Sequence, residues 1–236
     1  MARRTKPEAQ ATREHLLDTA EQVILARGLS RTSLQDIAQA AGLSRGAIYW
    51  HFADKVALFN AIMDRVDLPL EQALALARQG LPPGPAATQP DEPARPQPAP
   101  APAPAPAPDP LQALRTLALA PFLLMQRDPR AWRAFTILLH RAEFVGDLAP
   151  LAARQGDAIQ DCQGQMAALF DLAAQQGLLA PGITPPLAAT ALLALIDGLL
   201  RLYTLQGEGE APALLSAVAP AIDALLAGLR AAPAPG

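Results

Sequence analysis

Apolar residues recur at intervals of three and four along most of this chain, which is the spacing of amphipathic helices. The first expected helix runs from about Pro7 to Ala26, and Gly28 ends it. No stretch of alternating β-branched and polar residues stands out, so strands are not expected. Further helices are expected at about 55–78, 110–126, 129–145, 149–177, 185–206 and 211–230, with Pro, Gly and Asp between them. The pattern therefore predicts an all-α fold.

Residues 32–55 read TSLQDIAQAAGLSRGAIYWHFADK, which fits two short helices joined by a tight glycine turn and followed by the start of another helix. Thr32 can cap the first helix, with Gln35 as its capping-box partner. Gly42 fits the left-handed residue that ends a helix, and Ser44 can cap the next helix two residues on. This is the layout of a helix-turn-helix, so the segment predicts a DNA-binding domain.

The second helix of this motif carries small and basic residues on the faces that do not pack on the first. Arginine pairs with guanine and an alanine methyl touches a thymine methyl, so such a surface suits a major groove. Tyrosine, tryptophan, histidine and lysine supply donors for phosphate oxygens. The candidate DNA-contacting residues are Thr32, Ser33, Ser44, Arg45, Gly46, Ala47, Tyr49, Trp50, His51 and Lys55. The alternative is an ordinary helical hairpin in which Tyr49 and Trp50 serve as core.

The run from Thr32 to Lys55 resembles the DNA-binding domain of TetR-family transcriptional regulators. The opening MARRTKPEAQATREHLLDTAEQVILARG and the later HRAEFVGDLAPL are similar to the multidrug-efflux repressors of the AcrR and TtgR type. The resemblance covers nearly all of the chain except residues 80–108. It implies an N-terminal three-helix DNA-binding domain at 1–54, followed by a helical ligand-binding and dimerisation domain at 55–236.

Charge is distributed unevenly along the 236 residues, although the net charge is only −3. Residues 1–65 carry nine Lys and Arg against seven Asp and Glu, whereas the remainder carries ten against fifteen. Only the N-terminal part is therefore expected on DNA. The single cysteine, Cys162, excludes an internal disulfide framework, and the N-terminus has no signal-peptide pattern, so a cytoplasmic location is expected.

One apolar stretch, from Leu187 to Leu205, approaches the length of a membrane span. It contains Asp197 and Arg201 and many small alanines, which favours a helix inside a bundle. No membrane association is therefore expected.

Proline dominates the middle of the chain, with thirteen prolines in residues 81–110, mostly alternating with alanine. Proline at every second position forbids a helix, so a disordered or polyproline-like insertion is predicted at 81–108. We interpret it as a surface insertion in the second domain, and docking of a protein partner on it is the alternative.

The second domain shows no P-loop, nucleophile elbow, dinucleotide fingerprint or metal-ligand cluster, so neither an enzyme nor a cofactor or metal is expected. His140 and Glu143 share a helix face but lack the further ligands that a metal site needs.

Polar residues within apolar helices are the informative feature of this domain. Asp197 must either pair, for example with Arg201 one turn on, or face a cavity. The resemblance points to a drug pocket that includes Asp197, and the residues implied for it are Met63, Asp67, Phe135, Leu139, Ile196 and Asp197. His140 is either a pocket wall or a core histidine. Two acids in an apolar chamber suit a small hydrophobic or cationic inducer, and the alternative for these residues is structural ion pairs and ordinary core.

Two C-terminal helices carry apolar faces that predict a homodimer, because a monomer would leave too much apolar surface exposed. The faces consist of Leu192, Leu195, Leu199 and Leu202 on one helix and Leu214, Leu215, Val218, Ile222, Leu225, Leu226 and Leu229 on the other. A dimer also presents two recognition helices to a palindromic, double-stranded operator. The sequence thus favours a ligand-responsive repressor, for which the resemblance implies a multidrug-efflux operon. A DNA-binding regulator controlled by a protein partner is the alternative.

Overall fold

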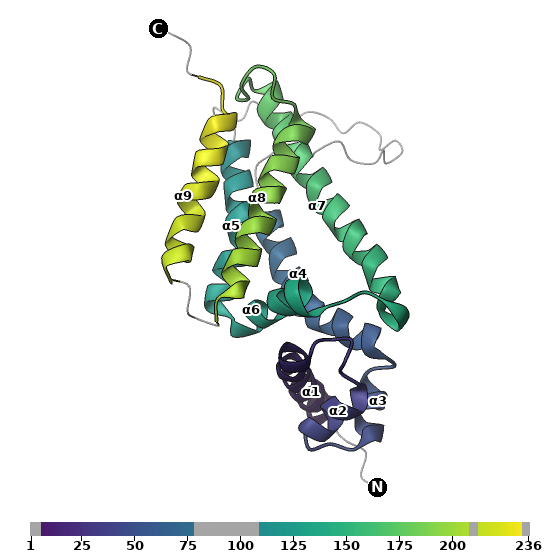
Figure 1. Ribbon diagram of the computed structural model, residues 1–236. Helices are drawn as coiled ribbons and strands as arrows, with labels where there is room; N and C mark the ends of the chain where they lie inside the picture. The colour runs from purple at the N-terminus through teal and green to yellow at the C-terminus, as the bar shows by residue number, and fades with distance from the viewer. Residues whose placement is uncertain (1–5, 78–108, 208–211, 233–236) are drawn as a thin grey trace, which may run out of the picture.

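The computed structural model describes residues 6–77, 109–207 and 212–232. A small head consists of α1 (Lys6–Arg27), α2 (Leu34–Ala40) and α3 (Arg45–His51), and it lies at one end of the elongated molecule in Figure 1. Apart from an isolated bridge between Leu179 and Arg230, the described residues contain only helices and their connections. The predicted all-α fold, with an N-terminal helix-turn-helix domain and a C-terminal helical domain, is confirmed.

The larger part of the molecule, which we call the body, is a bundle of long helices above the head (Figure 1). It is entered by α4 (Lys55–Ala77), whose first half packs on the head. The other elements are α5 (Pro110–Arg127), α6 (Pro129–Thr136), η1 (Ile137–Arg141), η2 (Gly146–Leu148), α7 (Ala149–Gln175), α8 (Pro185–Leu205) and α9 (Pro212–Leu229). Helices α8 and α9 lie side by side along one edge of the bundle in Figure 1.

Aspartate–proline pairs start two of the body helices. Asp109 accepts a hydrogen bond from the amide of Leu111 at 2.9 Å, and Asp128 accepts one from the amide of Arg130 at 2.9 Å. The proline that follows each aspartate fixes the first helical φ and lacks the N–H that would have no partner there. Asp128 also ends α5, so the chain turns sharply into α6.

The single helix expected at 129–145 is wrong in its second half. The α-helix ends at Thr136, the next five residues form the π-helical turn η1, and residues 142–145 are not helical. Such π turns displace the following residues around the helix axis and occur often at functional sites. Here the turn ends with the carbonyl oxygen of Arg141, which accepts a hydrogen bond from the amide of Leu29 in the head at 2.8 Å.

One helix among the described residues, α8, is long and apolar enough to cross a membrane by length and composition. In the structure it packs against α6, α7 and α9, and it buries Leu192, Ile196 and Leu199. These buried apolar residues therefore belong to the core of the bundle. The proline-rich insertion predicted at 81–108 lies outside the described residues.

Candidate nucleic-acid interface

A capping box fixes the start of α2. The side-chain oxygen of Ser33 accepts a hydrogen bond from the amide of Asp36 at 3.1 Å, and the carboxylate of Asp36 accepts one from the amide of Ser33 at 2.9 Å. The expected cap, Thr32 with Gln35, is wrong by one residue. The Thr32 side chain is buried, and its hydroxyl donates to the carbonyl of Gly28 at 2.8 Å.

The charge of Asp36 suits its place in the first turn of α2. Hydrogen bonds from the side chain and backbone of Ser33 lower the pKa of this carboxyl below its ordinary value. The carboxylate therefore persists at the helix end where the backbone dipole favours negative charge.

The turn between α2 and α3 has the predicted geometry. Gly42 has a φ of +68°, in the left-handed region, and no atom outside its chain neighbours lies within 4 Å of where a Cβ would be. Ser44 caps α3, because its hydroxyl oxygen accepts a hydrogen bond from the amide of Ala47 at 3.2 Å. Helix α3 therefore starts at Arg45, as required for a recognition helix led by an arginine.

Helix α3 turns one side to the head and the other to solvent. Ile48 is fully buried, and Phe52 at the end of the helix is almost so. On the outer side Tyr49 is 46% exposed and Trp50 is 71% exposed. The alternative in which Tyr49 and Trp50 form core is therefore wrong, and both aromatic side chains are available to a partner.

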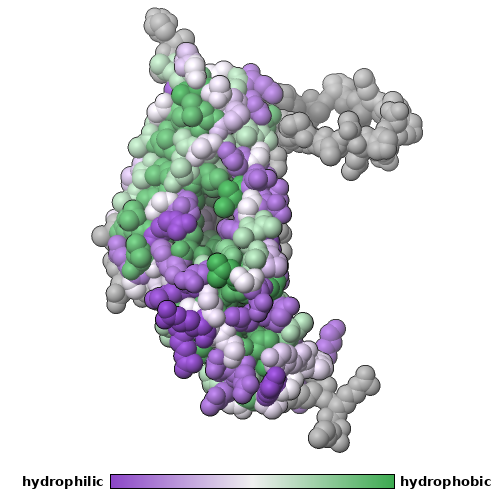
Figure 2. Space-filling model, turned by 45° about the vertical axis from the view of Figure 1, so that its right-hand side comes forward, coloured by the Kyte–Doolittle hydropathy of each residue, from purple (hydrophilic) through white to green (hydrophobic). Residues whose placement is uncertain are grey.

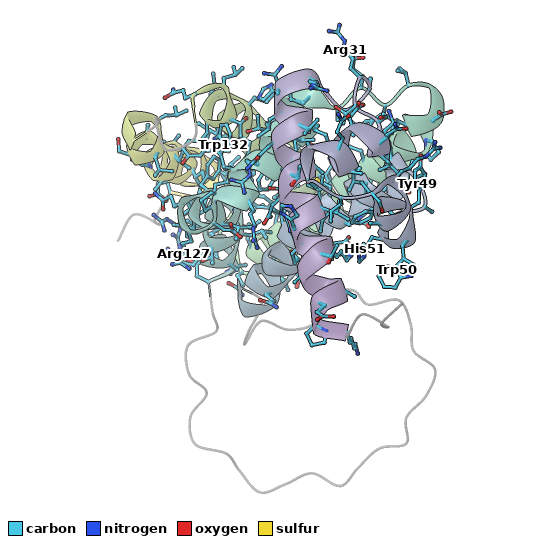
Figure 3. The ribbon with its side chains drawn as sticks, turned by 90° about the horizontal axis from the view of Figure 1, so that it is seen from below. Arg31, Tyr49, Trp50, His51, Arg127 and Trp132 are labelled. Atoms are coloured by element: carbon cyan, nitrogen blue, oxygen red, sulfur yellow. The ribbon has the colours of Figure 1, made fainter. Side chains whose placement is uncertain are left out.

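Side chains on the outer side of α3 contact one another. The guanidinium carbon of Arg45 lies 5.5 Å from the centre of the Tyr49 ring, and the Trp50 and His51 rings meet edge to face at 4.5 Å. Figure 3 views the molecule from the head end and shows Tyr49 and Trp50 at its outer margin, with His51 beside Trp50. These contacts limit the rotamers of side chains that a DNA groove would otherwise have to order.

A groove of about 540 Å³ opens beside α3, where the starts of α2 and α4 meet. Its wall includes a lysine that is already engaged: the Lys55 ammonium group lies 3.3 Å from the carbonyl oxygens of both Leu29 and Ser30. The ammonium group thereby fixes the loop between α1 and α2 as well as adding positive charge. The lining residues are Ser30, Arg31, Thr32, Ser33, Leu34, Tyr49, Ala53, Asp54, Lys55, Val56 and Asp147.

Arg31 is a basic residue of this groove that the sequence pattern did not single out. It is exposed, and Figure 3 shows it extending away from the head. Its position two residues before Ser33, the cap of α2, was the available signal, because a basic side chain near a helix start can accompany an anion bound there.

The residues implied for a drug pocket lie in the body. Met63, Phe135 and Ile196 are buried members of the hydrophobic core, whereas Leu139 and His140 are half-buried in the π turn. The structure describes α4 at position 67 but not the side chain of Asp67.

The π turn and α8 are joined by polar contacts. A ring nitrogen of His140 lies 2.9 Å from the hydroxyl oxygen of Thr204. Asp197 accepts a hydrogen bond from Arg201 at 2.8 Å, and the same guanidinium reaches the carbonyl of Leu139 at 3.3 Å. Asp197 therefore forms an ion pair with Arg201, which is one of the two alternatives expected for it. Both side chains are half exposed to solvent.

Much of the predicted dimer surface is instead core of one subunit. The buried members of the two expected faces are Leu192, Leu199, Val218, Ile222, Leu226 and Leu229. Assigning these side chains to a contact between copies was wrong, because they are buried within one subunit, where α8 and α9 pack on each other and on α5. Leu202 remains 54% exposed, and Leu205, which was not in the expected face, is 69% exposed.

Within the described residues no group of three or more His, Cys, Asp or Glu side chains is placed to hold a metal ion.

Comparisons with known proteins agree with this arrangement in both parts of the chain. Residues 16–62 match the bacterial regulatory proteins of the tetR family, and residues 109–225 match the C-terminal region of MAATS-type transcriptional repressors. The chain is 35% identical over 234 residues to the HTH-type transcriptional regulator TtgR of Pseudomonas putida, an alignment that covers 99% of each chain.

Two solved structures show the same fold. One is NalD, the secondary repressor of the MexAB-OprM multidrug efflux pump in Pseudomonas aeruginosa, with a TM-score of 0.74, 30% identity, and coverage of 95% of this chain and 98% of that one. The other is the complex of SmeT with triclosan, with a TM-score of 0.69, 28% identity, and coverage of 95% and 93%. SmeT is the repressor of the Stenotrophomonas maltophilia multidrug efflux pump SmeDEF. With its capped helix-turn-helix head, its helical body and its end-to-end similarity to TtgR, this chain belongs to the TetR family of bacterial transcriptional regulators.

Proposed function

We propose that this protein is a transcriptional repressor that binds a palindromic operator as a homodimer and leaves it when an apolar or cationic compound binds in the body. The observation that carries the proposal is the outer side of α3, where Arg45, Tyr49 and Trp50 are exposed on a helix that is capped at Ser44 and anchored by Ile48. Tyr and Trp side chains combine a large apolar ring with a hydrogen-bond donor and are enriched at interfaces for that reason.

Base and phosphate contacts divide between α3 and the groove beside it. Arg45, Gly46 and Ala47 lie in the first turn of α3, which enters the major groove in helix-turn-helix proteins and contacts base edges there. Ser44, Tyr49, Trp50 and His51 carry donors suited to the DNA phosphates, and Arg31 joins them from the groove. Ser33 also lines the groove, but its hydroxyl donates to Asp36 at 2.6 Å, so its contribution is through the cap of α2. Thr32 and Lys55 shape this surface through their bonds to the loop after α1, so their contribution to DNA binding is partly structural.

Two copies of α3 are needed, because seven residues contact too few base pairs for a specific site. We infer that the copies meet through the outer sides of α8 and α9. On α8, Leu187, Leu202 and Leu205 are exposed large apolar residues on one side of the helix. The exposed residues of the neighbouring helix α9 include alanine, serine and proline, whose short side chains permit close approach of a second copy.

The inducer is proposed to bind in the body, between α4, α6, η1 and α8. Figure 2 shows a hollow at mid-height of the body, with both apolar and hydrophilic surface around it. In this proposal Met63, Phe135, Leu139 and Ile196 supply apolar wall, and His140 and Asp197 supply polarity. The side chain of Asp67, the other acid that the resemblance implies, lies outside the described part of the structure. The repressors that this chain resembles control multidrug efflux pumps, and SmeT binds triclosan, which supports an efflux operon as the target and an apolar compound as the inducer.

Release follows if the compound prefers the conformation in which the two heads no longer match the spacing of successive major grooves. The protein performs no catalytic step in this scheme and needs no cofactor. Its place of action is the cytoplasm, where the operator is.

Equilibrium binding to the promoter fragment of its own gene tests the proposal. Titrations with triclosan and with tetraphenylphosphonium, an apolar cation that does not intercalate, should each be run at fixed DNA. Specific binding that either compound reverses supports the inducible repressor. Specific binding that neither compound changes refutes induction by these chemical classes and favours control by a protein partner, whereas absence of specific binding refutes the repressor itself.

A further inference from the structure

A row of acidic side chains on α1 faces the body. Glu14, Asp18 and Glu21 are four and three residues apart and therefore share one face of the helix. Each accepts a hydrogen bond from an arginine of another element, and the arginines are Arg65 of α4 and Arg130 and Arg133 of α6. Three acids thus meet three arginines where the head joins the body.

Glu21 is the centre of this cluster. Its side chain is 0% exposed, and its two carboxylate oxygens are divided between elements. Oε1 accepts a hydrogen bond from Arg65, and Oε2 accepts one from Nε of Arg133 at 2.9 Å. One buried carboxylate therefore links α1 of the head both to α4 and to α6 of the body.

Three contacts show how α1 and the loop after it are aligned with α6 and η1. Asp18 bonds Arg130, Glu21 bonds Arg133, and the amide of Leu29 bonds the carbonyl of Arg141. The partners in all three pairs are 112 residues apart, so the two segments run side by side in the same direction. We call residues 129–141, which comprise α6 and η1, the floor segment.

The floor segment also contacts α8. Arg201 donates to the carbonyl of Leu139 at 3.3 Å, and His140 meets Thr204 at 2.9 Å. A displacement of α8 relative to the floor segment must therefore either break these bonds or move the floor segment against α1.

A buried carboxylate that two arginines share disfavours intermediate orientations of the head on the body. An exposed ion pair that loosens is solvated by water at little cost, but a buried carboxylate that loses one of its two arginines is left with an unmatched charge. The head is then stable either with both partners in place or in a distinct arrangement, which is the property of a two-state element.

We propose that Glu21 is a positioning residue whose bond to Arg133 fixes the orientation of the DNA-binding head on the body, and whose rupture is the step that couples the body to operator release. The coupling part rests on the proposed repressor function, whereas the orientation part concerns the protein without DNA.

Pulsed electron paramagnetic resonance between two spin labels tests the orientation part. Labels at Gln39→Cys in the head and Asp171→Cys in the body, both exposed positions, are placed in a Cys162→Ser background. Dilution with excess unlabelled chain leaves one doubly labelled subunit per dimer, so only the distance within a subunit is measured.

The expected result is a narrow distance distribution for the parent protein and a broadened or shifted one for Glu21→Gln and for Arg133→Gln. Both single variants remove the Glu21–Arg133 ion pair, and Glu21→Gln also removes the one with Arg65, so the double variant should resemble Glu21→Gln. Arg133→Lys, which keeps the positive charge, should recover a distribution closer to that of the parent and shows that the change is not general unfolding. The matched control is Arg115→Gln, which removes a bidentate ion pair with Asp223 within the body and should leave the distance unchanged.

An unchanged narrow distribution in a folded Arg133→Gln protein overturns the proposal. The same holds if Arg115→Gln broadens the distribution as much as Arg133→Gln does.

Operator binding tests the coupling part. Allosteric couplings typically change affinity by about 5- to 150-fold. The ratio of operator Kd values with and without triclosan should fall toward one in Arg133→Gln and stay at the parental value in Arg115→Gln. A parental ratio in Arg133→Gln contradicts the coupling, while failure of the parent protein to bind the promoter contradicts the proposed function and leaves the spin-label result to decide the orientation part.

Discussion

Removing the Arg45 side chain should separate base recognition from general DNA affinity. Arg45 is exposed at the start of α3, and its guanidinium packs on the Tyr49 ring, 5.5 Å from the ring centre. An exposed cation–π contact contributes about 0.5–1 kcal/mol, so Arg45→Ala should leave the head folded. A base-contacting arginine contributes about 1–3 kcal/mol of discrimination, and a dimer presents it twice, which gives about 2–6 kcal/mol. This corresponds to a loss of roughly 30-fold to 10⁴-fold in operator affinity.

The assay is equilibrium binding to the promoter fragment and to a shuffled sequence of equal length, each at several salt concentrations. Arg45→Ala should weaken binding to the promoter and change binding to shuffled DNA little. Arg127→Ala is the control, because it removes the same charge from an exposed site in the body that Figure 3 shows away from Tyr49 and Trp50. Equal losses on both DNAs, with a salt slope reduced by about one for each arginine lost, would refute base recognition and make Arg45 a phosphate contact.

Three further predictions concern the head. Ser44→Ala removes the cap of α3 and should destabilise the head by about 0.5–2 kcal/mol, seen as faster hydrogen exchange of α3 amides, and unchanged exchange would contradict the cap. Gly42→Ala places a Cβ at a φ of +68° and should lower the free energy of unfolding by about 1–2 kcal/mol. Gly46→Ala, inside α3, should leave that free energy unchanged or raise it by up to about 1 kcal/mol. Thermal denaturation measures both variants, and equal effects would contradict the turn geometry. Burial raises the pKa of Glu21 above its ordinary 4.5, although the hydrogen bond from Arg133 acts in the opposite direction. The contribution of Glu21 to folding stability is therefore fully present below pH 4.5, and it declines as the pH rises through the pKa of the folded state. The stability of the parent protein relative to Glu21→Gln, measured by denaturation from pH 4 to pH 7, should therefore fall with rising pH, and a difference that rises would show the opposite shift.

Local chemistry made the recognition motif predictable from sequence. Gly42, which has no side chain, and Ser44 two residues later each specify a backbone state within a few residues, and the structure has both. The cap of α2 was misplaced because Thr32 and Ser33 are both good caps. Burial of the Thr32 side chain beside Gly28 decided between them, and burial is a tertiary property.

Long-range features were not predictable in the same way. The acids of α1 could be seen as a charged helix face, but their arginine partners lie 44 to 112 residues away in the chain. Ile222 and Val218 had been assigned to a dimer contact because an apolar stripe does not indicate whether it packs on its own chain or on a copy. The π turn likewise makes contacts with Leu29 and with α8, which are far from it in the chain and cannot be read from its own residues.

Titration of the purified protein against its own promoter fragment tests the central claim, that paired α3 helices bind adjacent turns of DNA. At moderate salt, the account predicts two subunits per site and an affinity at least about 10³-fold above that for shuffled DNA. A promoter fragment bound no more tightly than shuffled DNA, or not retarded at all at low ionic strength, would contradict it.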